Sequence, residues 1–158
     1  MVKYKFTVDD YYKAYEVGAL GLQRMELLEG EVYIMSPMGN KHRRYIGHLN
    51  HELIEHLGDK AVIFPQVPIQ LNKHSEPEPA FVIAKLPAKT YDQHPPGPQD
   101  IFFLIEISDT TLTHDRTLKL SQYIKAGISE IWIVDLVEDR LEMYRTPNYA
   151  PEYSYIGT

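Results

Sequence analysis

The sequence predicts a mixed α/β (α+β) fold, in which one central β-sheet is flanked by helices. Helical and strand patterns follow one another in the order helix, strands, helix, strands, helix, strands, which is typical of helices that cover a mixed sheet. The segment "IFFLIEIS" (101–108) is almost wholly apolar, as expected of a central strand buried on both faces. The chain has 158 residues, of which 44% are hydrophobic, so we expect residues 1–158 to form a single domain.

The first elements are a short helix and a β-hairpin. Thr7 and Asp10 have the spacing of a capping box, which opens a helix in "VDDYYKAYEVG". The segment "MELLEGEVYIMSP" (25–37) contains two short runs around Glu29-Gly30 and predicts a hairpin.

A longer helix is predicted in "KHRRYIGHLNHELIEHLGD" (41–59), because its apolar residues recur at helical spacing. We expect one stripe of this helix to face the sheet. The stripe consists of Ile46, Leu49, Leu53 and Leu57.

Two strands and a loop come next. The strand predicted at 61–71 carries Pro65 and Pro68, and proline cannot donate to a sheet ladder, so this strand should be bent, bulged or at an edge. The segment "AFVIAKL" (80–86) predicts a second strand, and the Pro- and Gly-rich segment 87–100 predicts a loop.

The C-terminal third completes the expected sheet. After strand 101–108, the segment "DRTLKLSQYIKAGI" predicts a helix that ends at Gly127, and 130–136 with 140–146 predicts a hairpin. The final residues, "YSYIGT", have the pattern of another strand beginning rather than of a tail. We therefore also consider that the natural protein continues beyond residue 158 and that this sequence is truncated at its C-terminus.

Composition limits the classes of function. The net charge is −6 with histidines neutral, whereas dedicated nucleic-acid binders are usually basic. This counts against charge-driven DNA binding but leaves room for an enzyme that contacts nucleic acid through a local patch. There are no cysteines, and the sequence predicts neither a signal peptide nor a membrane span. We expect a cytoplasmic protein.

Glu106 is the one charged residue in the strand at 101–108. Burying a lone carboxylate costs several kcal/mol unless it is paired or holds a metal. Alternatively, Glu106 lies at the strand end and reaches solvent or an arginine. Lys119 has two interpretations as well: a surface pair with Asp115 at i, i+4, or a lysine whose ammonium group returns over Glu106.

The helix at 41–59 begins with four residues that carry a positive charge or gain one on protonation: Lys41, His42, Arg43 and Arg44. Cations at a helix N-terminus oppose the helix dipole. Phosphate binding would explain them, and a solubilising surface is the alternative.

The histidines of the same helix also allow a zinc protein to be considered. The zinc-protease motif needs histidines at i and i+4, whereas His51 and His56 are five residues apart. His48 and His51 are three apart, but the sequence offers no third ligand. A solvated helix face is the simpler interpretation.

Together these segments resemble the Uma-two (Uma2) family, restriction-endonuclease-like proteins of the PD-(D/E)XK nuclease superfamily. The resemblance covers nearly the whole chain and implies a restriction-endonuclease-like fold with a mixed central sheet. The segments that carry it, in family order, are "MELLEGEVYIMSPMGNKHRRYIGHL", "EPEPAFVIAK", "IFFLIEIS", "DRTLKLSQYIKAGISEIWIVDL" and "LEMYR".

The resemblance implies roles for particular residues. Glu106 would be a metal ligand together with the backbone carbonyl of Ile107, and Glu26 would complete the acidic site. Ser108 stands where the superfamily usually has its lysine. The resemblance implies that the next helix supplies this lysine instead, as Lys119, which would lie at the attacking water. The resemblance also matches His42 to a family histidine; we take Lys41, His42, Arg43 and Arg44 to be nucleic-acid contacts.

Position 80 departs from the family pattern. The family has a metal-binding aspartate at the start of the strand that follows the Pro-Glu-Pro turn, and this chain has Ala80 there. Its origin is either a degenerate copy or a deliberate Asp→Ala change, and the otherwise complete site favours the deliberate change. Glu78 is an unfavourable substitute, because Pro79 restrains its backbone.

The resemblance therefore implies an endonuclease that uses Mg²⁺ or Mn²⁺ to hydrolyse DNA phosphodiester bonds, with metal binding weak or absent and cleavage impaired or lost because of Ala80. The alternative is a non-catalytic binding or assembly module on a nuclease scaffold. We expect a homodimer, the commonest assembly and one suited to cutting two strands, and no association with membranes.

Overall fold

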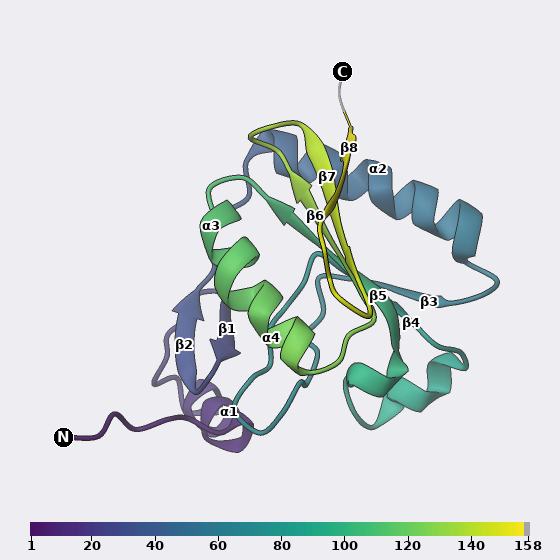
Figure 1. The fold of residues 1–158 in the computed structure, drawn as a ribbon. Coiled ribbons are helices and arrows are strands. Elements are labelled where there is room, and N and C mark those ends of the chain that lie inside the picture. The colour runs from purple at the N-terminus through teal and green to yellow at the C-terminus, as the bar shows by residue number, and fades with distance from the viewer. Residues whose placement is uncertain (157–158) are drawn as a thin grey trace.

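The computed structural model describes residues 1–156 and is built around a six-stranded sheet in the order β3-β4-β5-β6-β7-β8 (Figure 1). Only β5 and β6 pair in parallel, and the remaining neighbours are antiparallel. The predicted mixed central sheet is thus confirmed. The strands are β3 (Val62–Pro65), β4 (Phe81–Ala84), β5 (Ile101–Ser108), β6 (Glu130–Asp135), β7 (Arg140–Arg145) and β8 (Glu152–Tyr155).

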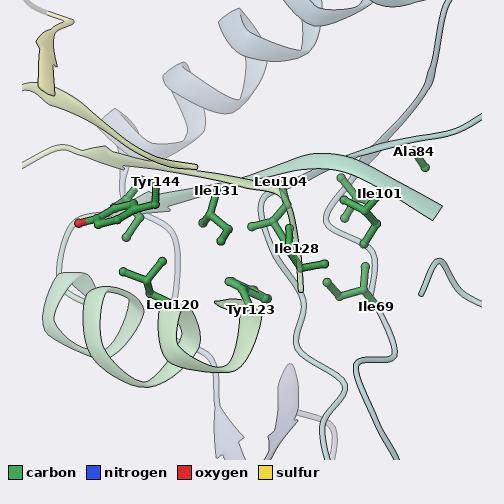
Figure 2. Packing of buried hydrophobic residues seen from close by; sticks show 11 residues of the cluster. Ile69, Ala84, Ile101, Leu104, Leu120, Tyr123, Ile128, Ile131 and Tyr144 are labelled. Carbon is green, nitrogen blue, oxygen red and sulfur yellow. The ribbon is translucent and has the colours of Figure 1, made fainter. Parts of the chain in front are cut away.

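β5 is a central strand, and from Leu104 onward it is buried on both faces. On one face, Leu104 packs in a cluster with Leu120 and Tyr123, which come from the helical segment after β5 (Figure 2). On the other face, Ile105 packs in a cluster that contains Leu53 of α2 (Asn40–Leu57). Helices therefore cover both faces of the sheet, which explains why the strand could be nearly free of polar residues.

The N-terminal elements form a separate layer beside the main sheet. α1 (Val8–Glu16) begins with the predicted capping box, in which Thr7 and Asp10 exchange side-chain and backbone hydrogen bonds. The predicted hairpin is β1 (Met25–Leu28) with β2 (Glu31–Ile34), and it forms its own two-stranded sheet. Its location at the side of the core sheet (Figure 1) was not predicted from the sequence.

The proline-containing strand is shorter than expected. β3 ends at Pro65 and lies at the edge of the sheet, as the prolines indicated. Gln66 then adopts a positive φ of 52°, so the chain leaves the sheet instead of continuing to residue 71. The loop at 87–100 contains two short 3₁₀ turns, η1 (Ala88–Asp92) and η2 (Pro98–Asp100).

The helix after β5 is continuous but not uniform. It consists of α3 (Leu112–His114), a π-helical turn η3 (Asp115–Lys119) and α4 (Leu120–Lys125). π turns inside helices are rare and often lie at functional sites. The predicted hairpin of β6 and β7 is present, and β8 confirms the expected strand near the C-terminus, while Gly157 and Thr158 lie outside the described residues. Within residues 1–156, no helix combines the length and apolar character needed to cross a membrane.

Candidate active site

A cavity of about 280 Å³ lies between the β1–β2 hairpin, the adjoining ends of β4 and β5, and the helix that contains η3. Several residues singled out in the sequence line it, although they come from different parts of the chain. Among them are Glu26, Ala80, Glu106 and Lys119. The fold therefore brings together the proposed acidic residues, the lysine and position 80, where the family resemblance implied an aspartate.

Lys119 is the centre of this group. Its ammonium nitrogen is 2.7 Å from Oε1 of Glu106 and 3.1 Å from Oε2 of Glu26. Lys119 is only 2% exposed, and each glutamate is 5% exposed. The interpretation of Lys119 as a surface residue paired with Asp115 is therefore wrong, and the lysine does return over the Glu106 carboxylate.

The two carboxylates have further partners on the protein side. Tyr123 donates its hydroxyl to Oε1 of Glu106 at 2.5 Å, and the backbone N–H of Glu78 donates to Oε2 of Glu26 at 3.0 Å. Nε2 of His114 lies 3.7 Å from the other oxygen of Glu26. Oε1 of Glu106 is thus shared by Lys119 and Tyr123, which leaves Oε2 of Glu106 for the cavity. Glu26, by contrast, is held by Lys119 and Glu78 on one oxygen and faces His114 with the other.

Burial and charge shift the pKa values of the three ionisable groups in this cluster. Burial raises the pKa of Glu106 to about 8, although Lys119 opposes the rise. Burial also acts to raise the pKa of Glu26, but the charge of Lys119, with hydrogen bonds from His114 and Glu78, lowers it to about 2. Burial acts to lower the pKa of Lys119, and its carboxylate neighbours outweigh this and raise it. With a pKa of about 8, the Glu106 carboxyl is mostly protonated at neutral pH, so the charge of Lys119 is balanced by Glu26. A bound cation would have to displace the proton of Glu106.

Asp115 is a site residue that sequence reasoning missed. It is 4% exposed and accepts hydrogen bonds from Ser108 at 2.6 Å and Thr111 at 2.7 Å. These bonds tie the start of the π turn to the end of β5. Since Lys119 ends the same turn, they help to aim it at Glu106. The sequence signal for this arrangement was Ser108, which stands where the family resemblance implied a lysine.

Ala80 contributes a methyl group to the cavity and is 8% exposed. Ala80 directly precedes β4, whose first residue, Phe81, pairs with Ile105 of β5. Ala80 and Glu106 line the same cavity. An aspartate at position 80 would therefore add a carboxylate to the wall of the cavity that Glu106 also lines.

The donor set partly fits a divalent metal ion. Glu26 and Glu106 offer carboxylate oxygens, and Ile107 lines the same cavity. Hard cations such as Mg²⁺ prefer oxygen ligands and are often held by one or two carboxylates plus water and phosphate. The methyl group of Ala80 supplies no donor at the position where the family resemblance implied an aspartate.

The basic residues at the start of α2 do not lie together. His42 lines the cavity, and burial lowers its pKa. Lys41 instead binds Asp139 at 2.6 Å and the carbonyl of Leu136 at 2.8 Å, in the turn after β6. Arg43 and Arg44 are exposed; Arg43 binds Asn40, and Arg44 lies over the ring of Tyr45.

The histidines considered for zinc belong to the outer face of α2. His51, Glu52 and Glu55 have ligand atoms within 4.8 Å of one another, and His51 and Glu55 are exposed. His51 pairs with Glu55 at 3.3 Å and His56 with Glu52 at 3.8 Å, both at i, i+4. His48 is not in this group. Ordinary surface pairing accounts for these contacts.

The comparisons with known proteins agree with this fold. Residues 8–155 match the model of the Uma2 family, described as "Putative restriction endonuclease". A similar solved structure is a "putative nuclease belonging to DUF820" from Anabaena variabilis ATCC 29413, with a TM-score of 0.68 and 16% sequence identity over 94% of this chain and 83% of that one. No curated protein matches the chain. The chain belongs to the Uma2 family and has a restriction-endonuclease-like fold.

Proposed function

We propose that this fold serves metal-dependent hydrolysis of DNA phosphodiester bonds, and that Ala80 leaves this chain inactive or impaired. The observation that carries the proposal is the convergence of Glu26 and Glu106 on Lys119 in one cavity, which position 80 also lines. Families with restriction-endonuclease-like folds generally use divalent metal ions, and membership of the Uma2 family supports DNA as the substrate.

In this proposal, Glu106, Glu26 and the carbonyl of Ile107 hold Mg²⁺ or Mn²⁺, and an aspartate at position 80 would complete the set. A bound metal ion polarises the phosphate and lowers the pKa of a coordinated water. Lys119 has a raised pKa, so it acts as a fixed cation that orients the water and neutralises developing charge. His42, on the cavity wall, faces the phosphate of the substrate.

A non-catalytic binding or assembly module is the second candidate. Two observations favour it: position 80 carries a methyl group, and the net charge is −6. In this case Lys119 serves to neutralise the buried glutamates, and the cavity holds a ligand without cleaving it.

The substitution Ala80→Asp separates the two candidates. A further carboxylate in the cavity should lower stability without metal, because it adds negative charge among acidic residues, and should create binding of Mg²⁺ or Mn²⁺. At a metal concentration one hundred times Kd, binding stabilises the folded state by about 2.7 kcal/mol. Melting temperatures in EDTA and in MgCl₂ or MnCl₂ report this gain, and plasmid and single-stranded DNA report cleavage.

Ala80→Asn is the matched control, since it has the shape of aspartate without the charge. We expect neither metal-dependent stabilisation nor cleavage from it. If Ala80→Asp binds no divalent metal and cuts neither form of DNA, the nuclease proposal is wrong and the binding module remains.

We further propose that residues 1–158 act as one domain in the cytoplasm and that two copies associate as a homodimer. Paired sites suit the cleavage of two strands, and two-fold dimers are the commonest assembly of soluble proteins. Light scattering of the purified chain tests the assembly.

A further inference from the structure

A second cavity, of about 240 Å³, adjoins the first. Tyr11, Tyr12 and Tyr15 of α1 line it. The two cavities share Arg24 and Glu78 as lining residues. The second cavity is therefore an aromatic recess beside the candidate active site, and its tyrosines come from α1, which Figure 1 shows next to the β1–β2 hairpin.

The tyrosines differ in how they are held. Tyr11 donates its hydroxyl to the carbonyl of Met25, and Tyr12 donates to the carboxylate of Glu76. Tyr15 is 51% exposed, and no hydrogen bond of its hydroxyl occurs in the described part of the chain. Tyr15 therefore offers a ring that a planar ligand can cover without breaking a contact of the fold.

Glu76 provides the polar group of this cavity. It is only 3% exposed, and its carboxylate has no cationic partner within residues 1–156; Tyr12 donates to Oε1, leaving Oε2 without a described partner. Burial raises its pKa, although Tyr12 opposes the rise. A buried carboxylate with a free oxygen is stabilised by a ligand that donates N–H groups.

We propose that this cavity binds one unstacked guanine of a single-stranded nucleic acid, with the base stacked on a tyrosine of α1 and its N–H edge on Glu76. The ring N–H and the exocyclic amino group of guanine lie side by side and match the two oxygens of a carboxylate. Stacking on aromatic side chains is the usual way in which proteins hold unpaired bases.

The charges favour a base over the other ligands that an aromatic recess could accept. A phosphate would be repelled by Glu76. A cationic group would suit Glu76 but would meet Arg24 at the boundary of the cavity. Arg24 pairs with Glu78 and is 45% exposed at its side chain, so it can also face the phosphate attached to a bound guanine. Since Arg24 lines both cavities, that phosphate would lead from the base towards the active site.

The inference rests on the proposed function for its choice of ligand, but binding can be tested without cleavage. The protein is titrated, with Ala80 in place, into labelled short oligo-dT with or without a single dG, and fluorescence anisotropy is measured. We expect the strand with dG to bind about tenfold more tightly, the size of one good bidentate contact to a base. Glu76→Gln should abolish this preference, because the amide cannot accept both N–H groups.

Tyr15→Leu should weaken binding of both strands by about tenfold, since stacking is tolerant of sequence. Tyr155→Leu is the matched control: Tyr155 is 91% exposed on β8, outside both cavities, and its loss should change nothing. Circular dichroism confirms that each variant is folded.

Absence of a dG preference in the parent chain overturns the inference, as does an unchanged preference in Glu76→Gln. Tighter binding of trimethylammonium compounds than of the dG strand assigns the cavity to cations and also overturns it. If Ala80→Asp cuts DNA while these variants bind like the parent, only the inference fails. If Ala80→Asp neither binds metal nor cuts, while the dG preference depends on Glu76, only the nuclease proposal fails.

Discussion

Replacing Lys119 by methionine should destabilise the protein more than any ordinary surface change. The substitution keeps the length of the side chain but strands two glutamates, each 5% exposed, that lie 2.7 and 3.1 Å from the ammonium group. Removing one partner of a buried ion pair costs about 3–5 kcal/mol. In a chain of this size, 1 kcal/mol changes the melting temperature by about 2–4 °C, so we expect a decrease of about 6–20 °C.

Urea unfolding followed by circular dichroism measures the free energy, and Lys125→Met is the matched control. Lys125 lies on α4, is 68% exposed at its side chain and approaches Glu29 only to 3.9 Å, so its loss should cost less than about 1 kcal/mol. Adding Glu106→Gln and Glu26→Gln to Lys119→Met removes the stranded charges and should recover much of the loss. A Lys119→Met protein within 1 kcal/mol of the parent, about the cost of an exposed pair, would refute this account of the site.

Two further substitutions test buried charges elsewhere. Glu76→Gln should raise the free energy of unfolding at neutral pH, because burial raises the folded-state pKa of Glu76. Between the unfolded-state and folded-state pKa values of Glu76, the folded state binds more protons than the unfolded state, so the parent gains stability as the pH falls through that window. The free energy of unfolding, measured across this pH range, should increase less in the variant than in the parent. Arg116→Met should destabilise by about 2 kcal/mol or more, since Arg116 pairs with Glu142 and with Asp135 at 3.0 Å, and both acids are fully buried. An unchanged melting temperature in Arg116→Met would contradict this prediction, because it would mean that other groups compensate the charges of Asp135 and Glu142.

Local patterns were sufficient for most of the elements. The capping box of Thr7 and Asp10, the hairpin turn at Gly30 and the apolar run at 101–108 each depend on neighbours in the chain, and each predicted its element. Residues 61–71 were predicted less well, because the strand ends where Gln66 turns out of the sheet at a φ of 52°. Local apolar spacing cannot reveal where a strand loses its partner.

Sequence was less informative about the partners of each site residue. Glu106 was conspicuous as a charged residue in an apolar strand, but the sequence left open whether it is buried and paired or reaches solvent. The structure decides this, because Lys119, thirteen positions away in the sequence, lies 2.7 Å from Glu106. Asp115 resembled a surface partner of Lys119 and is instead buried against Ser108. The sequence did not indicate a cavity at the tyrosines of α1. That cavity also needs Glu76, which is remote in the chain and meets the tyrosines only in the folded protein.

The sequence by itself determined the order and type of the elements, the family, and the absence of a carboxylate at position 80, since these follow from local patterns and from residue identity. The tertiary structure decided which charges meet. It brought Ala80 and Glu106 to the wall of one cavity, buried Lys119 at the end of a π turn, and directed the side chains of Lys41 and His42 to different places. Burial and charge pairing depend on distances between segments that are remote in the chain, and these distances exist only after the sheet and its covering layers have assembled.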